Sequence, residues 1–142
     1  MLKKIDQGRQ FLKGNQQLFR CPLCHAGVAV TENGLVCHQN HRFDLSKKGT
    51  LYFLSHGVKT EYDQSMFDPR RRMIQAGMYQ PVIDLLAQQV SQGSEVLDVG
   101  CGEGSFLNEL ARLQPLKKAV GFDLSKEGVY AATAQPVEAF WC

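Results

Sequence analysis

The chain has 142 residues, of which 44% are hydrophobic and 21% charged, a composition typical of a soluble globular protein. This length allows one domain, or one small and one partial domain. No apolar run approaches the roughly 20 residues that a membrane span requires, and no secretory signal follows Lys3 and Lys4. We therefore expect a cytoplasmic protein without a membrane partner.

The net charge of +2 is unevenly distributed along the chain. Residues 1–60 carry a net charge of +6, residues 61–94 carry −1 and residues 95–142 carry −3. A basic N-terminal part indicates a polyanionic partner, and a solvated basic face without a partner is the alternative. Residues 1–19 are weakly amphipathic and indicate either a short helix or a basic extension.

Three of the five cysteines and one histidine have the spacing of a metal site. Cys21 and Cys24 form a C-x2-C pair, and Cys37 and His41 form a C-x3-H pair. Zinc prefers four tetrahedral thiolate and imidazole ligands, and a complete set leaves no open position for catalysis. His25 or His38 could replace His41 as the fourth ligand, although the x3 spacing favours His41.

The segment between the two pairs predicts a zinc ribbon. Asn33-Gly34 lies between alternating apolar residues, a strong hairpin signal, and a hairpin returns the second pair to the first. A ribbon of about 35 residues is too small to fold on its core alone, so the metal would supply the stability. Residues 50–54 predict a closing strand with Tyr52 and Phe53 on opposite faces. One ring is expected in the core, and the other either packs there or stacks on an unpaired base.

Residues 55–69 read as a linker that leads into two helices. Asp68 is the expected N-cap of the first helix, with Pro69 at its first position, and Gly77 can end it. The second helix is expected to present an apolar face of Val82, Ile83, Leu85, Leu86 and Val90.

The stretch from Val96 to Gly104 reads as a buried strand and a glycine turn, and a helix follows to about Leu113. A second strand at 119–123, a helix from Ser125 to about Ala134 and a third strand at 137–142 complete a βαβαβ pattern. The loop is G-x-G-x-G, which matches neither the dinucleotide fingerprint nor the P-loop. The chain looks like the front portion of a longer protein, or a truncated one, because its third strand would be an uncovered edge.

Acidic residues accompany this loop. Asp98 lies inside the first strand, and Asp123 follows the second strand, as the ribose-binding acid of nucleotide folds does. A ligand that is rich in hydroxyl groups and lacks phosphate fits this pattern, and S-adenosylmethionine is the leading candidate. An ordinary tight turn in a domain without a ligand is the alternative.

Several motifs in one order resemble the 23S ribosomal RNA guanine-N1 methyltransferases. The motifs are the ribbon from Phe19 with Cys21, Cys24, Cys37 and His41, then Arg42-Phe43-Asp44, Lys48-Gly49, the Arg70-Arg71-Arg72 helix, the turn at 77–81 and the loop at 97–104. The resemblance covers about residues 19–142. It implies methyl transfer from S-adenosylmethionine to N1 of a guanine in a hairpin loop of 23S rRNA, the expected partner. Members of this family are considerably longer than this chain.

The resemblance also implies roles for individual residues. Cys21, Cys24, Cys37 and His41 would hold structural zinc. The cofactor-binding set would comprise Tyr79, Asp98, Gly100, Gly102, Glu103, Gly104 and Asp123. Asp123 would accept bonds from the ribose hydroxyls, whereas Tyr79 could instead be a buried aromatic residue under the sheet. No residue is a convincing general base for the guanine N1 proton.

The expected fold class is thus α/β, with an N-terminal zinc ribbon and the first half of a class I methyltransferase sheet. We divide the chain into a ribbon with a basic extension (1–56), a linker with helices (57–94) and a partial S-adenosylmethionine-binding domain (95–142). A non-catalytic zinc-dependent RNA-binding module with a vestigial methyltransferase half is the main alternative. A small-molecule methyltransferase with an accessory zinc knuckle is a third hypothesis, against which the basic N-terminal part argues. Whether the chain forms a homodimer is left open.

Overall fold

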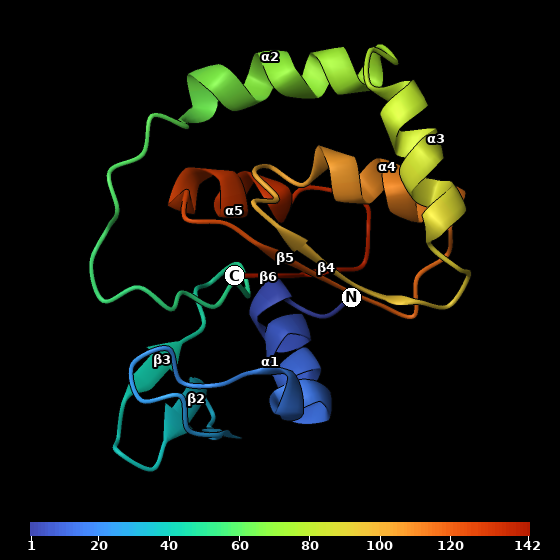
Figure 1. Ribbon diagram of the computed structural model, residues 1–142. Coiled ribbons are helices and arrows are strands. Elements are labelled where there is room, and N and C mark those ends of the chain that lie inside the picture. Colours follow the sequence, from blue (N-terminus) through green and yellow to red (C-terminus); the bar gives the residue numbers. More distant parts are fainter. The chain divides into compact units, whose positions relative to one another are not determined.

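The structure, a computed structural model, describes every residue from 1 to 142 and separates into two units, residues 1–55 and 56–142. In the colours of Figure 1 the first unit runs from blue to teal and the second from green to red. Each unit has buried apolar residues of its own. No helix combines the length and the apolar character that crossing a bilayer would require.

The first unit is a helix packed against a small antiparallel sheet. Its elements are α1 (Lys4–Asn15), the short 3-10 helix η1 (Gln16–Leu18), β1 (Val28–Val30), β2 (Gly34–Cys37) and β3 (Arg42–Asp44), with strand order β1-β2-β3. Helix α1 contacts β2, and the side chains of Leu12 and Leu35 are fully buried between these elements and their neighbours. Of the two alternatives for residues 1–19, the helix is the one that forms.

The hairpin predicted at Asn33-Gly34 is confirmed. Strands β1 and β2 pair with Val28 opposite Cys37 and Val30 opposite Leu35. Residues 31–33 connect them, and the Thr31 N–H donates to the Gly34 carbonyl at 2.8 Å. The pairing returns Cys37 to the start of the hairpin, as the zinc-ribbon interpretation requires.

The strand predicted at residues 50–54 does not form. Only an isolated bridge joins Leu51 to Leu45, and β3 is the strand that completes the sheet. In a tight turn from Ser46 to Thr50, the Ser46 N–H donates to the Thr50 carbonyl at 2.8 Å. These two backbone groups are therefore not available to pair a longer strand. Gly49 in this turn has φ of +73°, and its backbone lies against α1.

The side chains after that turn still contribute to the core. The ring of Phe53 lies 5.3 Å from that of Phe43 and 6.0 Å from that of Phe19, measured between ring centroids. Phe53 therefore packs in an aromatic cluster, while Tyr52 is equally half-buried and its hydroxyl oxygen is buried. Stacking of Tyr52 on a nucleic-acid base stays a prediction.

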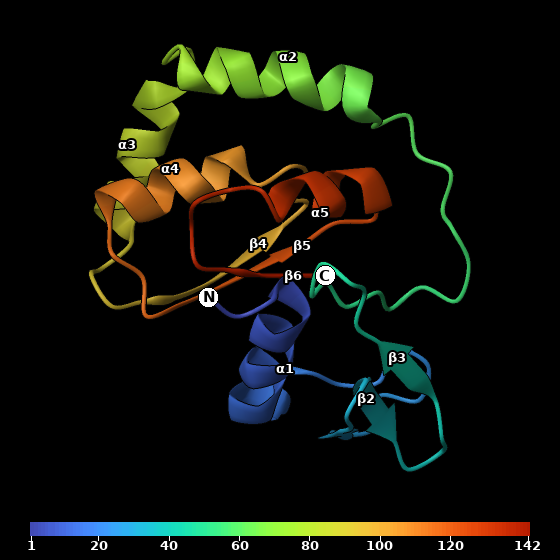
Figure 2. The same cartoon turned by 180° about the vertical axis from the view of Figure 1, so that it is seen from behind.

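The second unit is a three-stranded parallel sheet with flanking helices. Its elements are α2 (Gln64–Gln75), α3 (Gln80–Gln89), β4 (Glu95–Val99), α4 (Ser105–Leu113), β5 (Lys118–Phe122), α5 (Lys126–Ala132) and β6 (Phe140–Trp141), with strand order β4-β5-β6. Helices α4 and α5 lie on the same side of the sheet in both views, and α2 contacts both of them (Figures 1 and 2). This βαβαβ arrangement after a ribbon confirms the predicted fold class.

Helix α2 starts earlier than the sequence predicted. Its N-cap is Asp63, whose carboxylate accepts from the Ser65 N–H at 2.9 Å, and Pro69 lies inside the helix. The carboxylate of Glu127 on α5 accepts from the Gln64 N–H at 3.0 Å, so two of the first N–H groups are satisfied before Pro69 is reached. The prediction of an N-cap at Asp68 was therefore wrong.

The predicted end of α2 at Gly77 is confirmed. Gly77 has φ of +86°, its N–H donates to the Ile74 carbonyl at 3.0 Å, and the Met78 N–H donates to the Met73 carbonyl at 3.1 Å. This is a Schellman motif, which favours glycine at the left-handed position. The chain can then turn sharply into α3.

The core of the second unit lies between the sheet and helices α4 and α5. It consists of Cys101, Leu107, Ala119, Val129, Ala132 and Trp141. The Trp141 ring lies against the backbone of Gly121 and Gly104, so closely that a methyl group on Gly121 would overlap it. On β4 and α3, in contrast, Leu97, Val99, Val82, Leu85 and Leu86 are exposed. Of the apolar face predicted for α3, only Ile83 is fully buried.

The contact between Gly121 and Trp141 yields a stability test. We expect Gly121→Ala to lower the free energy of unfolding by about 1–3 kcal/mol, because the added methyl group overpacks the core. Urea titration followed by circular dichroism measures the change. Gly57→Ala in the same unit is the matched control, since no atom lies within 4 Å of its added methyl group. Equal stability of the two variants would contradict this packing.

Candidate functional site

Two tight turns present the four candidate metal ligands of the first unit. In the first turn the His25 N–H donates to the Cys21 carbonyl at 2.8 Å, and His25 has φ of +57°. In the second turn the Asn40 N–H donates to the Cys37 carbonyl at 2.9 Å, and Asn40 has φ of +64°. The first bond spans four residues and the second three, so the turns differ in length, but each has a left-handed residue and carries one pair of the candidate ligands.

The ligand atoms of Cys21, Cys24, Cys37 and His41 all lie within 4.8 Å of one another. The His41 Nδ1 atom is 3.3 Å from both the Cys21 and the Cys37 Sγ atoms, and the Sγ atoms of Cys24 and Cys37 are 3.7 Å apart. Tetrahedral bonds of about 2.3 Å to sulfur and 2.0 Å to nitrogen would place ligand atoms about 3.6–3.8 Å apart. The donor set therefore fits zinc, and neither His25 nor His38 belongs to the cluster.

The electrostatics of the cluster favour thiolate at Cys21. Burial raises the pKa of this thiol, but hydrogen bonds from the Cys24 and Leu23 backbone outweigh burial and lower the pKa to about 6. At Cys24 a bond from the Ala26 backbone lowers the pKa, yet burial and the neighbouring Cys21 and Cys37 leave it raised. Thiolate is the form that binds metal.

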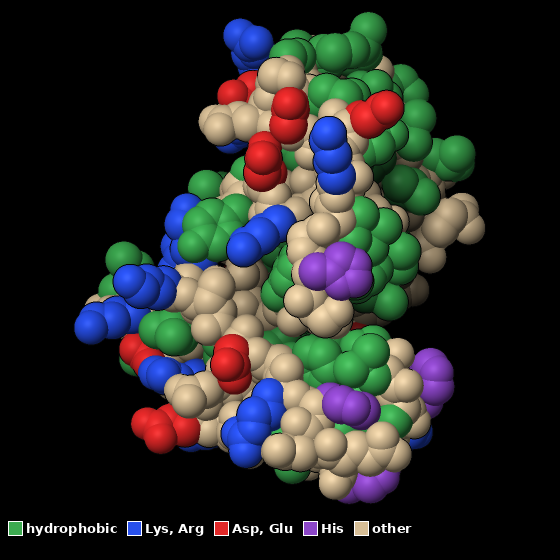
Figure 3. All heavy atoms as spheres, turned by 90° about the vertical axis from the view of Figure 1, so that its left-hand side faces the viewer, with side chains coloured by type: hydrophobic (Ala, Val, Ile, Leu, Met, Phe, Trp, Pro, Cys, Tyr) green, Lys and Arg blue, Asp and Glu red, His purple; other side chains and the backbone are tan.

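The first unit exposes many cations. Residues 1–55 contain eight Lys and Arg and three Asp and Glu, a net charge of +5. Exposed members are Lys3, Lys4, Lys13, Arg20, Arg42, Lys47 and Lys48. On the face shown in Figure 3, Lys and Arg side chains lie scattered among polar and acidic ones. The cations are therefore dispersed over this face.

The second candidate site is the glycine loop that follows β4. Gly100, Gly102 and Gly104 have φ of +78°, +55° and +81°, left-handed values that glycine adopts without strain. The N–H groups of Gly100 and Cys101 both donate to the Phe122 carbonyl, at 2.7 and 3.0 Å. The loop is thereby held at the carboxyl ends of β4 and β5, where open α/β sheets bind their ligands.

The three glycines have different surroundings. No atom lies within 4 Å of a methyl group built on Gly100, whereas one on Gly102 would lie 3.0 Å from the Phe67 ring of α2. One on Gly104 would lie 2.6 Å from the Trp141 ring. Of the three glycines, only Gly100 thus has open space on the side where a Cβ would lie.

Asp123 connects the loop to the end of β5. One carboxylate oxygen accepts from the Gly102 N–H at 2.8 Å, and the other accepts from the Ser125 N–H at 2.7 Å. Asp98 lies close by, since it pairs with Gly121 in the sheet. Burial raises the pKa of Asp98, the Arg70 charge partly offsets this, and the Asp123 charge raises the pKa further.

The remaining predicted residues lie in packed surroundings. The Tyr79 ring, at the start of α3, makes an edge contact with the Phe106 ring at 5.7 Å. The Glu103 side chain is 3% exposed, and its carboxylate accepts from the Ser105 hydroxyl at 2.6 Å and from the Gln135 amide at 3.0 Å. The structure thus brings Asp98, the glycines and Asp123 to one edge of the sheet.

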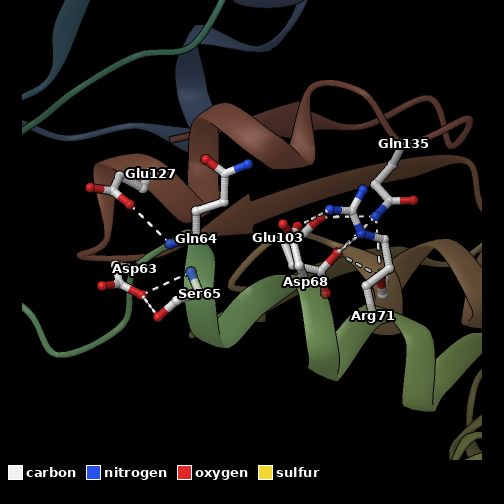
Figure 4. A network of polar contacts seen from close by, with 9 residues as sticks. Asp63, Gln64, Ser65, Asp68, Arg71, Glu103, Glu127 and Gln135 are labelled. Carbon is white, nitrogen blue, oxygen red and sulfur yellow. Dashed lines mark hydrogen bonds and ion pairs between the residues drawn. The ribbon is translucent and has the colours of Figure 1, made fainter.

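Sequence reasoning missed the polar network around Glu103. Arg71 on α2 bonds Asp68 at 2.5 Å, and its Nε lies 4.0 Å from the Glu103 carboxylate (Figure 4). Gln135 also donates to the Glu103 carbonyl at 2.9 Å. The network ties α2 and the segment after α5 to the glycine loop. No spacing rule predicts it, because its members, from Asp68 to Gln135, are up to 67 positions apart.

The Cys/His cluster predicts a metal-dependent fold. We expect Cys24→Ser or His41→Ala to abolish bound zinc and to unfold the first unit, since a structural site contributes on the order of 10 kcal/mol to folding. Zinc content and circular dichroism measure both effects. His38→Ala is the matched control and should keep the metal. Unchanged zinc in Cys24→Ser would rule out the assigned ligands.

The Glu103 network predicts a cost for removing its central acceptor. Glu103→Ala should lower the free energy of unfolding by about 1–3 kcal/mol, because the buried Ser105 hydroxyl and the Gln135 amide lose their partner. Urea denaturation of the full chain measures this. Glu138→Ala, at an exposed carboxylate of the same unit, should change stability little. If both variants lose the same stability, the network has no special role.

Comparisons with known proteins cover both units. Residues 19–55 match the family model described as RlmA, N-terminal, a zinc ribbon, and residues 90–136 match a methyltransferase domain model. One chain of a solved complex between the Haloferax volcanii Trm112 methyltransferase activator and the "putative methyltransferase" is also similar. It has a TM-score of 0.50 and 26% identity, over 60% of this chain and 39% of that chain.

Two curated relatives extend across both regions. A Bacillus subtilis (strain 168) protein named "Putative 23S rRNA (guanine-N(1)-)-methyltransferase YxjB" is 39% identical over 87% of this chain and 48% of its own length. A Streptomyces fradiae 23S rRNA (guanine(748)-N(1))-methyltransferase is 30% identical over 82% of this chain and 45% of its own length. The chain spans about half the length of these relatives. It therefore combines a region similar to the RlmA N-terminal zinc ribbon with a region similar to a methyltransferase domain, and both relatives carry names of 23S rRNA (guanine-N1)-methyltransferases.

Proposed function

We propose that the chain is the RNA-binding and cofactor-binding part of a methyltransferase that acts on N1 of a guanine in 23S rRNA. The observation that carries the proposal is the glycine loop at the carboxyl edge of β4 and β5, with Asp98 and Asp123 beside it. The two relatives named as enzymes of this activity support it, because they match the ribbon and the loop in one continuous stretch.

The proposed cofactor is S-adenosylmethionine, which when bound supplies an electrophilic methyl group. Asp123 would accept from the ribose hydroxyls, because each of its oxygens has a lone pair left after its backbone bond. Gly100 offers open backbone, and the Glu103 N–H makes no hydrogen bond in the structure. Together with Gly102, Gly104, Asp98 and Tyr79, these residues form the proposed cofactor-binding set.

The proposed role of the first unit is to hold RNA. Cys21, Cys24, Cys37 and His41 would bind zinc as a structural ion, since four protein ligands leave no open position. The exposed cations around the ribbon would contact phosphates of the rRNA hairpin. The proposed division of labour assigns RNA to residues 1–56 and the cofactor to residues 95–142, with 57–94 connecting them. Orientation of the guanine would supply much of the rate enhancement.

Calorimetric titration of the full chain tests both halves of this proposal. The first titrant is S-adenosylhomocysteine, and the second is a hairpin RNA with the sequence of a 23S rRNA loop. We expect both titrants to bind. Asp123→Ala should weaken the binding of S-adenosylhomocysteine and leave RNA binding unchanged. RNA binding without any nucleoside binding would instead favour a non-catalytic zinc-dependent RNA-binding module.

The ionic-strength dependence of RNA binding tests the electrostatic part. The RNA affinity should fall steeply between 50 and 200 mM salt, because each phosphate contact releases counterions. Lys13→Gln and Lys47→Gln should each reduce the slope of log affinity against log salt concentration by about one. Lys117→Gln, in the acidic second unit, is the matched control. An affinity independent of salt would contradict phosphate contacts by the first unit.

A further inference from the structure

Helix α2 places an arginine beside the glycine loop. The Phe67 ring is 3% exposed and packs on the backbone at two points, since methyl groups on Gly102 and Gly128 would lie 3.0 and 2.8 Å from it. Arg70 lies three residues further along the helix, almost one turn, and therefore on the same side. The Arg70 Nη1 atom is 3.8 Å from the position of a methyl group on Gly102.

The neighbouring arginines of α2 differ in their partners. Arg71 is engaged by Asp68 and lies near Glu103, so its role in the structure is to hold the helix on the loop (Figure 4). Arg70 is exposed, and no hydrogen bond or ion pair of the structure uses its guanidinium. Arg72 is also exposed. Arg70 is thus a cation at the loop whose guanidinium makes no hydrogen bond or ion pair in the structure.

Charges of both signs lie around the loop. Arg70 is near enough to Asp98 to act on its carboxyl group electrostatically, yet the two form no direct ion pair. Both groups consequently keep donors or acceptors for a ligand. A ligand group that carries a carboxylate and an ammonium group on one carbon, as an α-amino acid does, would complement this pair.

We propose that Arg70 binds the carboxylate at the amino-acid end of the cofactor, with Asp98 facing the ammonium group of that same end. The inference rests on the proposed function, because it needs an adenosyl ligand whose ribose lies at Asp123. A guanidinium suits this role, since its planar donors match a carboxylate in a bidentate pair. Arg70 would then determine specificity for adenosyl compounds that retain the amino-acid group.

Calorimetry with two ligands isolates this contact. S-adenosylhomocysteine carries the amino-acid group, whereas 5′-methylthioadenosine has the same adenosyl moiety without it. We expect Arg70→Ala to lower the affinity for S-adenosylhomocysteine by about tenfold to hundredfold. The affinity for 5′-methylthioadenosine should stay unchanged. Arg70→Lys should restore part of the loss, because it keeps the charge but not the fork. Arg72→Ala, on the same helix, should bind both ligands like the unaltered chain.

Each other outcome has a defined meaning. Equal binding of S-adenosylhomocysteine by Arg70→Ala and the unaltered chain would overturn the inference and leave the proposed function standing. An equal loss for both ligands would show a structural role of Arg70 and would also overturn it. Weakened RNA binding alone would assign Arg70 to phosphate contacts instead. If the unaltered chain bound neither nucleoside, the proposed cofactor site would fail together with the inference.

Discussion

The second unit depends on the hydrogen bonds that hold its glycine loop in a left-handed backbone conformation. The Phe122 carbonyl accepts two N–H groups from the start of the loop, and the Asp123 carboxylate accepts one from its middle. These bonds come from the end of β5, so the loop can form only when β4 and β5 are paired. The pairing of the strands therefore sets the geometry of the candidate site. The glycines allow the backbone to adopt that geometry, but they do not impose it.

Helix α2 adds a second layer of support to this loop. Phe67 fills the space over two glycines, and Arg71 with Gln135 approaches the buried Glu103 carboxylate. Apolar packing and a polar network thus act on the same few residues. Such support is what allows loop atoms to be held within the tolerance that binding sites require. The residues that provide it lie more than 25 positions from the loop on either side.

Local patterns predicted the features that depend on neighbouring residues. The C-x2-C and C-x3-H spacings pointed to the four side chains that the structure brings together, and the strand-glycine-helix order located the loop. Errors arose where tertiary contacts decided the outcome. Glu127 and Asp63 start α2 before Pro69, although the proline signal favours a later start. The Ser46–Thr50 turn likewise took the hydrogen bonds of a strand that β-propensity alone would predict.

The position of Trp141 has a spectroscopic consequence. It is the only tryptophan of the chain, it is 5% exposed, and its ring lies against Gly104 at the end of the glycine loop. The Cys101 side chain belongs to the same core cluster. Indole emission responds to the polarity and the quenching groups around the ring, so the chain carries a native fluorophore next to its candidate cofactor loop. Rearrangement of that loop would change the emission without any added label.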